Sequence, residues 1–540
     1  MLRTKPKRRT SALVFAALLL VVLLVGACAP AGSSVETLVV LIDNDEGPIT
    51  PANFNTFIGY YMGGWVYDQL FVRSTDLISV PALSTEAIQS EDGLTWEVKL
   101  REDVKWHDSE AFTADDVVFT YNWLKAAGRA PALEVMASIQ ANGEHGVTIA
   151  LQEPSPFFLD EALAQYYIMP EHIWKDQEPV SGELSQFQGK IGTGPYKLLE
   201  IVPGESYTFE ANPDYYRGEP QVQNLIAKIV KDRTQQFNQL KAGDASAVLS
   251  SVPPSLVEEL SGTEGIDLAQ GSDFFNYVFY ANGSRPPFDN PKARQAIALA
   301  IDAQKLVDTV MLGQGILLPV SYYHPDLPWA INVPGEYDPE AAKALLDEAG
   351  LVDSDGDGIR ELNGEPASYE VLCDVNNAVE VRSTELIVDM LEDVGIQSEQ
   401  RCMDIDTAVT YIWPSFVAVP DPEYDLGIWG WSSAPQIQRG FLRFLTNCNL
   451  EETGWANLTG TCDPVLDELF AEYVTNPDLA RQEELATAIQ EQFAETMVFI
   501  PVMSPGGNFA YRPADYDGWQ YMKGTGIMTL WSFLPEGAAE

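Results

Sequence analysis

His107 and Asp108 are adjacent in the sequence and could in principle form an acid–base pair. The chain has only four histidines, and it contains neither the His-Glu-x-x-His motif of zinc hydrolases nor the Gly-x-Ser-x-Gly motif of serine hydrolases. Its 79 acidic residues make neighbouring carboxylates common, so their spacing identifies no glycosidase pair. Thr113 has the N-cap type for a helix that begins just after this segment, which indicates a structural turn at His107. We therefore expect no catalytic residues and a protein that is not an enzyme.

An acidic loop is the most specific chemical motif of the chain. The sequence Asp353-Ser354-Asp355-Gly356-Asp357-Gly358-Ile359-Arg360-Glu361 matches the first nine positions of a calcium loop. Position 12 is Gly364, so Glu361 or Glu365 would have to replace the usual bidentate glutamate. A tight acidic turn with solvated charges is the alternative. We predict a structural calcium ion, and no required cofactor, with the ligands Asp353, Asp355, Asp357, Ile359 (through its carbonyl) and Glu361.

The N-terminal segment has the pattern of an exported lipoprotein. Basic residues precede an apolar run from Ala12 to Val25, which is shorter than the about 20 residues that span a membrane. The run ends in Val25-Gly26-Ala27-Cys28, which is similar to a bacterial lipobox; an ordinary signal peptide is the alternative. We expect a signal peptide over 1–27, a lipidated Cys28 and a tether over 28–35. The protein would be held on a membrane, in the periplasm or on the outer face of the cell membrane.

Four further cysteines suggest disulfide bonds in an oxidising compartment. Cys448 and Cys462 would close a short loop, while Cys373 and Cys402 lie in two expected strands and could also meet. The formal net charge of −47 disfavours nucleic acid and anionic lipid headgroups as partners. A chain of 540 residues is long enough for two or three domains.

Strand-like and helix-like patterns alternate along the chain, which predicts an α/β fold. Helices are expected over 114–127, from Pro291 after the cap Asn290, and from Asp338 to Gly350. Residues 369–375 and 396–403 are expected strands with a helix between them, the pattern of a βαβ unit. No repeat or low-complexity linker divides the chain, so the domains should be interleaved.

Several short sequence motifs occur along the chain in an order that is typical of one family of exported receptors. They are residues 81–83, 92–96, 100–108 and 112–118; residues 192–198 with 212–216; Asn282 with residues 286–290 and 294–297; and residues 424–426 with Gly430-Trp431 and residues 500–502. Together they resemble family 5 of the bacterial solute-binding proteins, the oligopeptide and dipeptide receptors of ABC importers. The matches cover nearly the whole chain after the leader.

The resemblance implies a two-lobed periplasmic-binding-protein type II fold (cluster C) with an inserted domain. The first lobe would contain residues 36–80, 190–274 and 505–540, the inserted domain 81–189, and the second lobe 275–504. Two chain crossings, near Phe275 and Met503, would form the hinge. The resemblance also implies a monomer that captures a small solute between its lobes and delivers it to the permease subunits of an ABC importer.

Residues on both sides of the expected cleft are candidates for ligand contact, because solute pockets combine apolar walls with a few polar groups. The predicted contacts are Tyr60, Trp65, Phe275, Tyr277, Trp429, Trp431, Ser432 and Gln436. Peptide-binding members of the family usually have an Asp shortly after the Gly-Trp pair, where this chain has Ser432 and Ser433. Because a buried ammonium without a carboxylate is costly, a peptide and a neutral oligosaccharide both stay open as ligands. A secreted glycan hydrolase and a sensory receptor are the rival functions.

Overall fold

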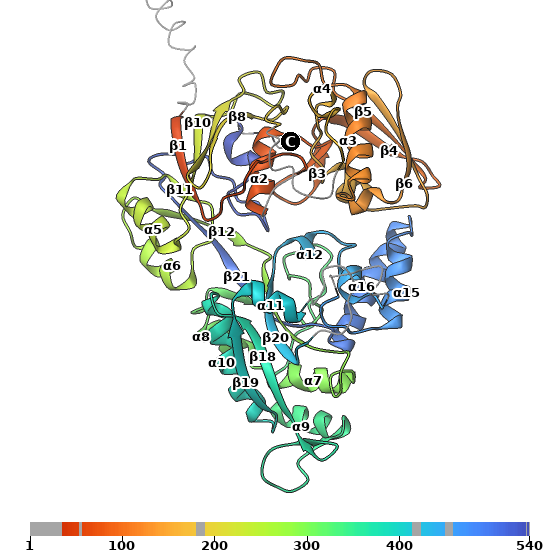
Figure 1. Cartoon of the computed structure of the whole chain (residues 1–540), viewed down its shortest axis with the longest axis vertical. Helices are drawn as coiled ribbons and strands as arrows, with labels where there is room; N and C mark the ends of the chain where they lie inside the picture. The colour runs from red at the N-terminus through yellow and green to blue at the C-terminus, as the bar shows by residue number, and fades with distance from the viewer. Residues whose placement is uncertain are drawn as a thin grey trace, which may run out of the picture.

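The computed structural model describes residues 35–52, 57–179, 189–412, 423–448, 457–535 and 537–538. An upper part contains the first described strand and an inserted domain, and a lower part tapers away from it (Figure 1). Cys28, the predicted lipidation site, lies outside the described residues. Within the described ranges, no helix has both the length and the apolar character needed to cross a membrane.

A single mixed sheet continues from the upper to the lower part, in the order β19-β18-β20-β13-β21-β11-β1-β10-β9-β8. Its upper half belongs to the first lobe, where β1 pairs in parallel with both β10 and β11. The strands of this lobe are β1 (Val35–Ile42), β8 (Tyr196–Val202), β9 (Ser206–Ala211), β10 (Val222–Ile229), β11 (Ala247–Val248) and β12 (Asp267–Ser272). Its helices are α2 (Phe57–Val66), α5 (Arg233–Ala242), α6 (Pro254–Ser261) and the short η3 (Leu530–Phe533).

The inserted domain has its own four-stranded sheet, in the order β4-β5-β7-β6, which lies at the right of the upper part in Figure 1. A separate buried core, which includes Trp96, Tyr121 and Trp174, fills the space between this sheet and α3. The strands of this sheet are β4 (Ser84–Gln89), β5 (Thr95–Leu100), β6 (Met136–Ala141) and β7 (Gly146–Leu151), and a separate two-stranded sheet of β2 (Phe71–Arg73) and β3 (Ser79–Pro81) precedes them in the chain. The helical segments are α3 (Ala114–Ala126), η1 (Pro131–Leu133), η2 (Leu159–Leu163) and α4 (Glu171–Trp174).

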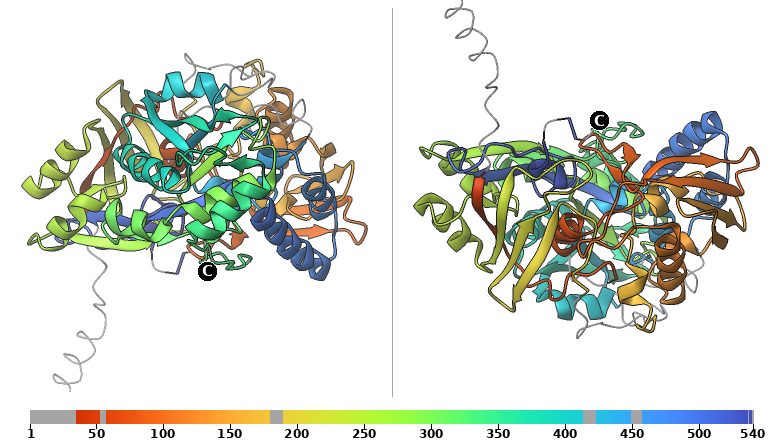
Figure 2. Two further views of the ribbon diagram at one scale, coloured as in Figure 1. Left: turned by 90° about the horizontal axis from the view of Figure 1, so that it is seen from below. Right: turned by 90° about the horizontal axis from the view of Figure 1, so that it is seen from above.

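The second lobe covers its half of the large sheet with helices on both sides (Figure 2). Its strands are β13 (Asn276–Ala281), β14 (Gly315–Leu317), β18 (Ser368–Asp374), β19 (Gln397–Met403) and β20 (Leu426–Trp431), with a small sheet of β15 (Leu351–Val352), β16 (Glu361–Leu362) and β17 (Glu365–Pro366). Its helices are α7 (Pro291–Ala300), α8 (Ala303–Thr309), α9 (Pro339–Glu348), α10 (Ala378–Glu392), α11 (Ile405–Ile412), α12 (Ala434–Ile437), α13 (Leu442–Thr446), α15 (Pro464–Tyr473) and α16 (Leu479–Thr496).

The helices and strands expected from the sequence are confirmed. They form where capping residues and apolar periodicity both favour them. The backbone N–H of Thr113 donates to the Asp116 carboxylate at 3.0 Å at the start of α3, as in a capping box. The Asn290 side chain accepts from the Lys292 N–H at the start of α7. Strands β18 and β19 pair in parallel around α10, which confirms the βαβ unit.

Strand β13 is buried along its whole length because each of its two faces packs against a different core. Tyr277 and Phe279 point into the core under α7 and α10, whereas Val278 and Tyr280 point into the core beside α15 and α16. A strand that is covered on both faces has no polar alternation in its sequence. This explains the nearly continuous apolar run from residue 277 to 281.

Strand β21 (Ile500–Tyr511) connects the lobes. Its first part pairs with β13 of the second lobe, up to Met503, and its last part pairs with β12 of the first lobe, from Gly506. The other crossing is the short segment between the end of β12 and the start of β13, at 272–276. Each lobe therefore reaches the other through two neighbouring chain segments, which is the arrangement of a hinge.

Candidate ligand-binding cleft

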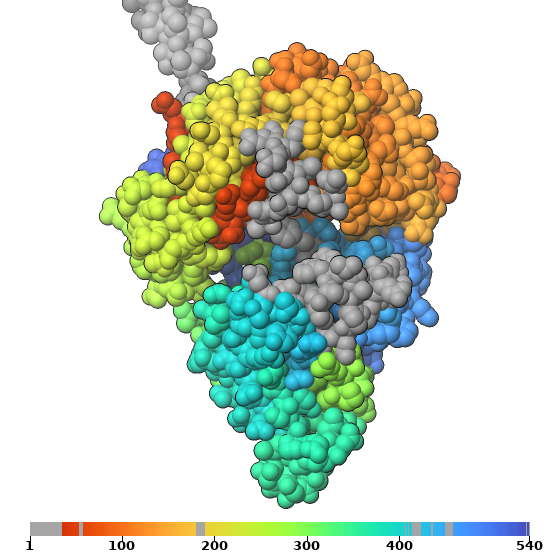
Figure 3. Space-filling model, in the orientation of Figure 1, coloured from red at the N-terminus to blue at the C-terminus, as the bar shows by residue number. Residues whose placement is uncertain are grey.

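A cavity of about 690 Å³ lies beside the two crossings; we call it the hinge cavity. Figure 3 shows the boundary between the upper and lower parts as a hollowed band on one face of the molecule. The first lobe contributes Asp43, Ile58, Tyr61, Arg233, Ser250, Phe509 and Met528 to the lining of the hinge cavity. The second lobe contributes Phe275, Tyr277, Met311, Asn377, Ser432 and Ser433. A solute in this cavity would therefore contact both lobes.

Phe275 and Tyr277 form the aromatic wall of the hinge cavity, with ring centroids 5.1 Å apart. Both come from the start of the second lobe, where β13 pairs with β20. The ring of Phe275 lies directly over Gly430, and a Cβ at that glycine would be 2.3 Å from the Phe275 Cζ atom. Position 430, in the Trp-Gly-Trp segment, therefore needs a glycine because the Phe275 ring approaches the backbone so closely, and not because the chain turns there.

Three charged residues line the hinge cavity. Arg233 and Asp43, both of the first lobe, form an ion pair at 3.4 Å. Asp273 lies on the crossing between β12 and β13, and burial raises the pKa of its carboxyl to about 6, against the opposing effect of the Arg233 charge. The cavity thus contains one carboxylate that is poorly solvated and not neutralised by the existing ion pair.

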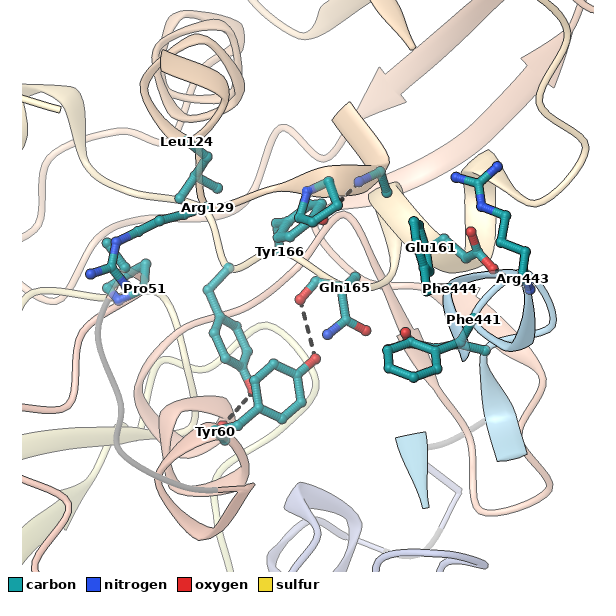
Figure 4. Close-up of a pocket in the computed structure, with 16 residues that line it drawn as sticks. Pro51, Tyr60, Leu124, Arg129, Glu161, Gln165, Tyr166, Phe441, Arg443 and Phe444 are labelled. Carbon is teal, nitrogen blue, oxygen red and sulfur yellow. Dashed lines mark hydrogen bonds between the residues drawn. The ribbon is translucent and has the colours of Figure 1, made fainter. Parts of the chain in front are cut away.

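A second cavity of about 510 Å³, the outer cavity, lies between the inserted domain and the second lobe (Figure 4). Here the Gly440 N–H of the second lobe donates to Glu161 Oε1 of the inserted domain at 3.0 Å. Burial raises the pKa of Glu161, while this hydrogen bond and the charges of Arg443 and Arg73 oppose the rise. Glu161 is therefore a contact between the lobes as well as a lining residue.

A narrow middle cavity of about 80 Å³ separates the other two. Tyr60 lines the outer and middle cavities, and Tyr61 lines the middle and hinge cavities. The Tyr60 hydroxyl donates to the Gln165 carbonyl at 3.1 Å and accepts from the Gln69 side chain at 2.8 Å, which fixes the ring of Tyr60. The first turns of α2 therefore stand where the three cavities meet.

Four of the eight predicted ligand contacts line these cavities: Tyr60, Phe275, Tyr277 and Ser432. The other four, Trp65, Trp429, Trp431 and Gln436, line none of the three. Trp65 is 0% exposed and makes edge contacts with Phe209 and Phe533 in the core of the first lobe. Its place on the same helix as Tyr60 suggested ligand contact, but it lies on the face of α2 that is turned to the core.

The predicted second-lobe residues on either side of Gly430 also pack into the core. Trp431 is 8% exposed and packs near Phe499, and Trp429 packs against the same core. The Gln436 side chain is fully buried, where it accepts from the His324 N–H at 2.7 Å and donates to the Tyr322 carbonyl. Trp65, Trp429, Trp431 and Gln436 thus have packing contacts here, and their contact with a ligand stays a prediction.

Several lining residues were not predicted from the sequence, including Arg129, Glu161, Arg233, Asp273, Asn377 and Arg443. Asp273 is the one for which the sequence offered a signal, because it is two residues from the crossing expected at Phe275. The arginines and Glu161 have no distinguishing local pattern. Arg129, Glu161 and Arg443 come together only where the inserted domain packs against the second lobe, whereas Arg233 lies on α5 of the first lobe.

His107 has a structural role. Its Nε2 lies 3.0 Å from the Gly194 carbonyl, and its Nδ1 accepts from the Gly192 N–H at 3.2 Å. Burial lowers the pKa of the His107 imidazole to about 4. The glycines are needed for close packing, since a Cβ at Gly192 would overlap the Val66 carbonyl oxygen. His107 thus holds the glycine turn against α2, and it does not line any of the three cavities.

The acidic loop brings side-chain oxygens of Asp353, Asp355, Asp357 and Glu361 within 4.8 Å of one another. Asp353 accepts from the Gly356 and Gly358 N–H groups, and Glu361 bends back to accept from Ser354. Disulfide bonds join Cys373 to Cys402, across the paired strands β18 and β19, and Cys448 to Cys462.

Two lobes that are joined by two crossings and that enclose a cavity lined from both sides define a solute-binding receptor. The family of bacterial extracellular solute-binding proteins, family 5 (middle), matches residues 79–449. The chain belongs to this family, whose members bind solutes and are not enzymes.

The relatives agree with this assignment over almost the whole chain. The oligopeptide-binding protein AppA of Bacillus subtilis is 27% identical over 478 residues, which cover 84% of this chain and 83% of AppA. The structure of AppA in complex with a nonapeptide has a TM-score of 0.77 at 22% identity and covers 94% of this chain and 100% of that one. NikZ from Campylobacter jejuni, in complex with Ni(L-His), has a TM-score of 0.76 at 22% identity, with coverage of 92% and 99%. The structural matches establish the shared fold, and the bound ligands are those of the other proteins.

Proposed function

We propose that this chain captures peptides between its two lobes and delivers them to an ABC importer. The observation that carries the proposal is the hinge cavity, which both lobes line and which combines aromatic walls with an ion pair and the carboxylate of Asp273. Relatives that include AppA and a probable di/tripeptide-binding protein of Pseudomonas aeruginosa are named for peptide binding, which supports the same ligand class.

The case for a neutral oligosaccharide rested on Ser432 and Ser433, which stand where peptide-binding relatives usually have an Asp. That case is weakened because a carboxylate enters the same cavity from the hinge, at Asp273. An ammonium group in this cavity would find a partner, so its burial would not carry the full cost of an isolated charge. Peptides are therefore the preferred ligand class.

Capture would proceed by closure of the lobes around the solute. A ligand shifts the equilibrium between open and closed forms only through the difference in its affinity for them, and a shift from 1:99 to 99:1 requires about 5.5 kcal/mol. The importer would recognise the closed outline of a monomer and supply the energy for transport. Small-angle scattering with and without ligand would measure closure, and light scattering would test the monomeric state.

We also propose that Cys28 carries a lipid anchor after removal of residues 1–27. The proposal is supported by the basic start, the apolar run and the Val25-Gly26-Ala27-Cys28 sequence. Mass spectrometry of the N-terminal peptide from the native host would show two or more acyl chains. A Cys28→Ser variant would leave the membrane fraction if the proposal is right and stay in it if the proposal is wrong.

For the acidic loop we propose a structural calcium ion. The clustered oxygens of Asp353, Asp355, Asp357 and Glu361 would repel one another less with a cation among them. Addition of calcium should raise the thermal unfolding temperature, and this rise should be lost in Asp355→Asn but kept in Asp389→Asn, a change on α10 outside the loop. An equal rise in both variants would contradict the proposal.

The central test of function is the identity of the natural ligand. Protein purified from the native host would be denatured and the released molecules identified by mass spectrometry. Peptides found at a stoichiometric amount support the proposal, and sugars contradict it. In a thermal-shift screen, a ligand at 100 times its Kd stabilises by about 2.7 kcal/mol. Recovery of each screened peptide unchanged would separate binding from hydrolysis.

A further inference from the structure

A buried carboxylate, that of Glu380, lies behind the wall of the hinge cavity. Residues 376–379 line the cavity, whereas Glu380, the next residue of the chain, does not line it and is only 3% exposed. Glu380 is the third residue of α10, a position where a glutamate commonly helps to cap a helix. Its carboxylate does more than cap α10, because it also accepts hydrogen bonds from two strands.

Three N–H groups from three segments converge on the Glu380 carboxylate. The Asp374 N–H, at the end of β18, donates to Oε2 at 2.9 Å, and the side-chain amide of Asn377, the helix cap, donates to Oε1 at 3.1 Å. The third donor is the backbone N–H of Gly430 in β20. Strand β18 pairs with β20 at residues 371 and 372 and ends at Asp374, so Gly430 lies beyond this pairing. The carboxylate therefore takes the place of a strand partner for Gly430.

Two of these donors also hold the aromatic wall of the hinge cavity. The Asn377 amide donates to the Tyr277 hydroxyl at 3.5 Å, which ties the helix cap to the phenol. The backbone of Gly430 lies directly under the Phe275 ring. A shift of Asn377 or Gly430 therefore moves a ring that lines the cavity, although Glu380 itself lies outside the lining.

The ionisation of Glu380 decides whether all three donors have a good acceptor. A carboxylate accepts from several N–H groups at once, whereas a protonated carboxyl contains a hydroxyl that must itself donate. Burial raises the pKa of Glu380 to about 7, and the nearby Asp374 charge adds to this rise, while the hydrogen bonds from Asp374, Asn377 and Gly430 oppose it. Glu380 therefore changes its charge close to neutral pH.

The titration of Glu380 has to be separated from that of its neighbours. The Glu380 charge acts on the phenols of Tyr277 and Tyr280 in β13, and burial raises the pKa of Tyr277 to about 12 and that of Tyr280 well above its ordinary value. Asp273 also lines the cavity, and burial raises its pKa to about 6. Strand β20 has no charged or titratable side chain, and those on α10 and on the elements that pack most closely against it are Arg382, Glu385, Asp389 and Glu392 (α10), Tyr369, Glu370 and Asp374 (β18), Glu399 and Arg401 (β19), and Lys292 and Arg294 (α7).

We propose that Glu380 is a positioning residue for the solute site, whose ionised carboxylate holds Asn377 and Gly430 where the wall of the hinge cavity binds solute. Proton uptake by Glu380 leaves one of the three donors without its acceptor and loosens the wall. Solute binding favours the ordered wall, and the ordered wall favours the ionised carboxylate. Affinity is therefore complete above about pH 7 and falls as the pH decreases below that value. This inference rests on the proposed function and adds the dependence of the same site on one proton.

The test compares peptide affinity at two pH values in matched variants. Alanine peptides of three to five residues are titrated by calorimetry at pH 6 and pH 8 against unmodified protein, Glu380→Gln and the control Glu392→Gln, an exposed acid at the other end of α10. Unmodified protein and the control should bind about fivefold more weakly at pH 6, because one N–H loses its acceptor. Glu380→Gln should already bind about fivefold more weakly at pH 8 and lose much less on acidification, since its amide cannot become a carboxylate. The peptide α-amino group titrates near about pH 8 in all three cases, so the difference between variants isolates Glu380.

Hydrogen exchange provides a measurement that needs no ligand. In ligand-free, unmodified protein, the protection of residues 426–431 should fall about fivefold from pH 8 to pH 6, relative to β10, which corrects for the ordinary effect of pH on exchange. In Glu380→Gln this protection should be low at both pH values. Because exchange is followed in unmodified protein as well, a variant that fails to fold leaves the test intact.

Three results overturn the proposal. The first is a Glu380→Gln variant that keeps the pH profile of unmodified protein, and the second is exchange of residues 426–431 that does not respond to pH. The third is loss of the pH profile in Asp273→Asn, which would assign the titration to Asp273. If no alanine peptide binds at either pH, the result counts against peptides as the ligand class of the proposed function, while the exchange measurement still decides whether Glu380 holds the wall.

Discussion

The hinge cavity and the outer cavity are both lined by two lobes, but the chain connects their walls in different ways. At the hinge, Asp273, Phe275 and Pro505 lie on the crossing segments themselves, so both walls are covalently continuous. In the outer cavity, the walls come from the inserted domain and from the segment around α13, which approach each other only in space. The Gly440–Glu161 hydrogen bond joins these walls, and the rings of Phe157 and Tyr473, 4.9 Å apart, are a further contact between the inserted domain and the second lobe.

This difference indicates which part of the cleft is already formed in the ligand-free, open protein. Walls that share the crossing segments move little when two lobes rotate about those segments, so the hinge cavity should persist in the open form. The outer cavity should form only on closure, because its two sides separate most when the lobes open. A ligand would first be held at the hinge, and contacts in the outer cavity would then favour the closed form.

The largest expected effect is on the hinge side. Phe275→Ala removes the ring that lies over Gly430 and forms the wall of the hinge cavity, and we expect the Kd for the natural ligand to rise about thirtyfold, or about 2 kcal/mol. Phe444→Ala, a matched change in the outer cavity, should raise the Kd less. Calorimetry on both variants measures the difference. Equal increases in Kd would mean that the two cavities contribute equally to ligand affinity, which would contradict this prediction.

A smaller effect is expected on stability, because the buried Asp273 carboxylate lowers the free energy of unfolding. Burial raises the pKa of Asp273 to about 6, above the ordinary value of an aspartate, so the folded protein binds this proton more tightly than the unfolded chain does. The carboxyl therefore lowers the free energy of unfolding as pH rises from about 4 to about 6. Asp273→Asn should stabilise the ligand-free protein by about 1 kcal/mol at pH 7.5, given the partial exposure of the side chain, and by much less at pH 4.

Thermal or urea unfolding at the two pH values measures this effect. The titratable groups around the carboxyl include Arg233, Asp43 and the phenols of Tyr61, Tyr277 and Tyr521, and burial raises the pKa of each phenol further above the pH range tested. Asp267→Asn is the control at an exposed site. An Asp273→Asn variant that loses stability at pH 7.5 would show that the carboxylate is a structural partner and not a charge kept for the ligand.

Sequence patterns predicted the fold well because they report local rules. The capping residues of α3 and α7 and the periodicity of α10 act within a few residues. The two chain crossings between the lobes were predicted from the order of the family motifs along the chain. The crossing expected near Phe275 and Met503 lies where β12, β13 and β21 meet.

The residues of the site were predicted only in part, because whether a residue lines a cavity depends on the direction in which its side chain points once the chain has folded. Tyr60 and Trp65 lie on one helix, five residues apart, and face different surroundings: Tyr60 faces the outer cavity and Trp65 faces the core. Aromatic type alone cannot distinguish these roles. Glu161 and Gly440 are 279 residues apart, and no local pattern indicates that they meet.

The smallest effect tests closure itself. Glu161→Ala leaves the Gly440 N–H without its acceptor when the lobes close, which should cost about 1 kcal/mol in the closed form and nothing in the open form. The population would shift toward the open form, and the Kd should rise about fivefold. Asp160→Ala is the control, because the Asp160 carboxylate accepts from the Ser79 hydroxyl within the upper part of the molecule. Small-angle scattering of the ligand-free Glu161→Ala variant should show a larger radius of gyration than the control. An unchanged radius with weaker binding would place Glu161 among the ligand contacts and would remove it from the closure mechanism.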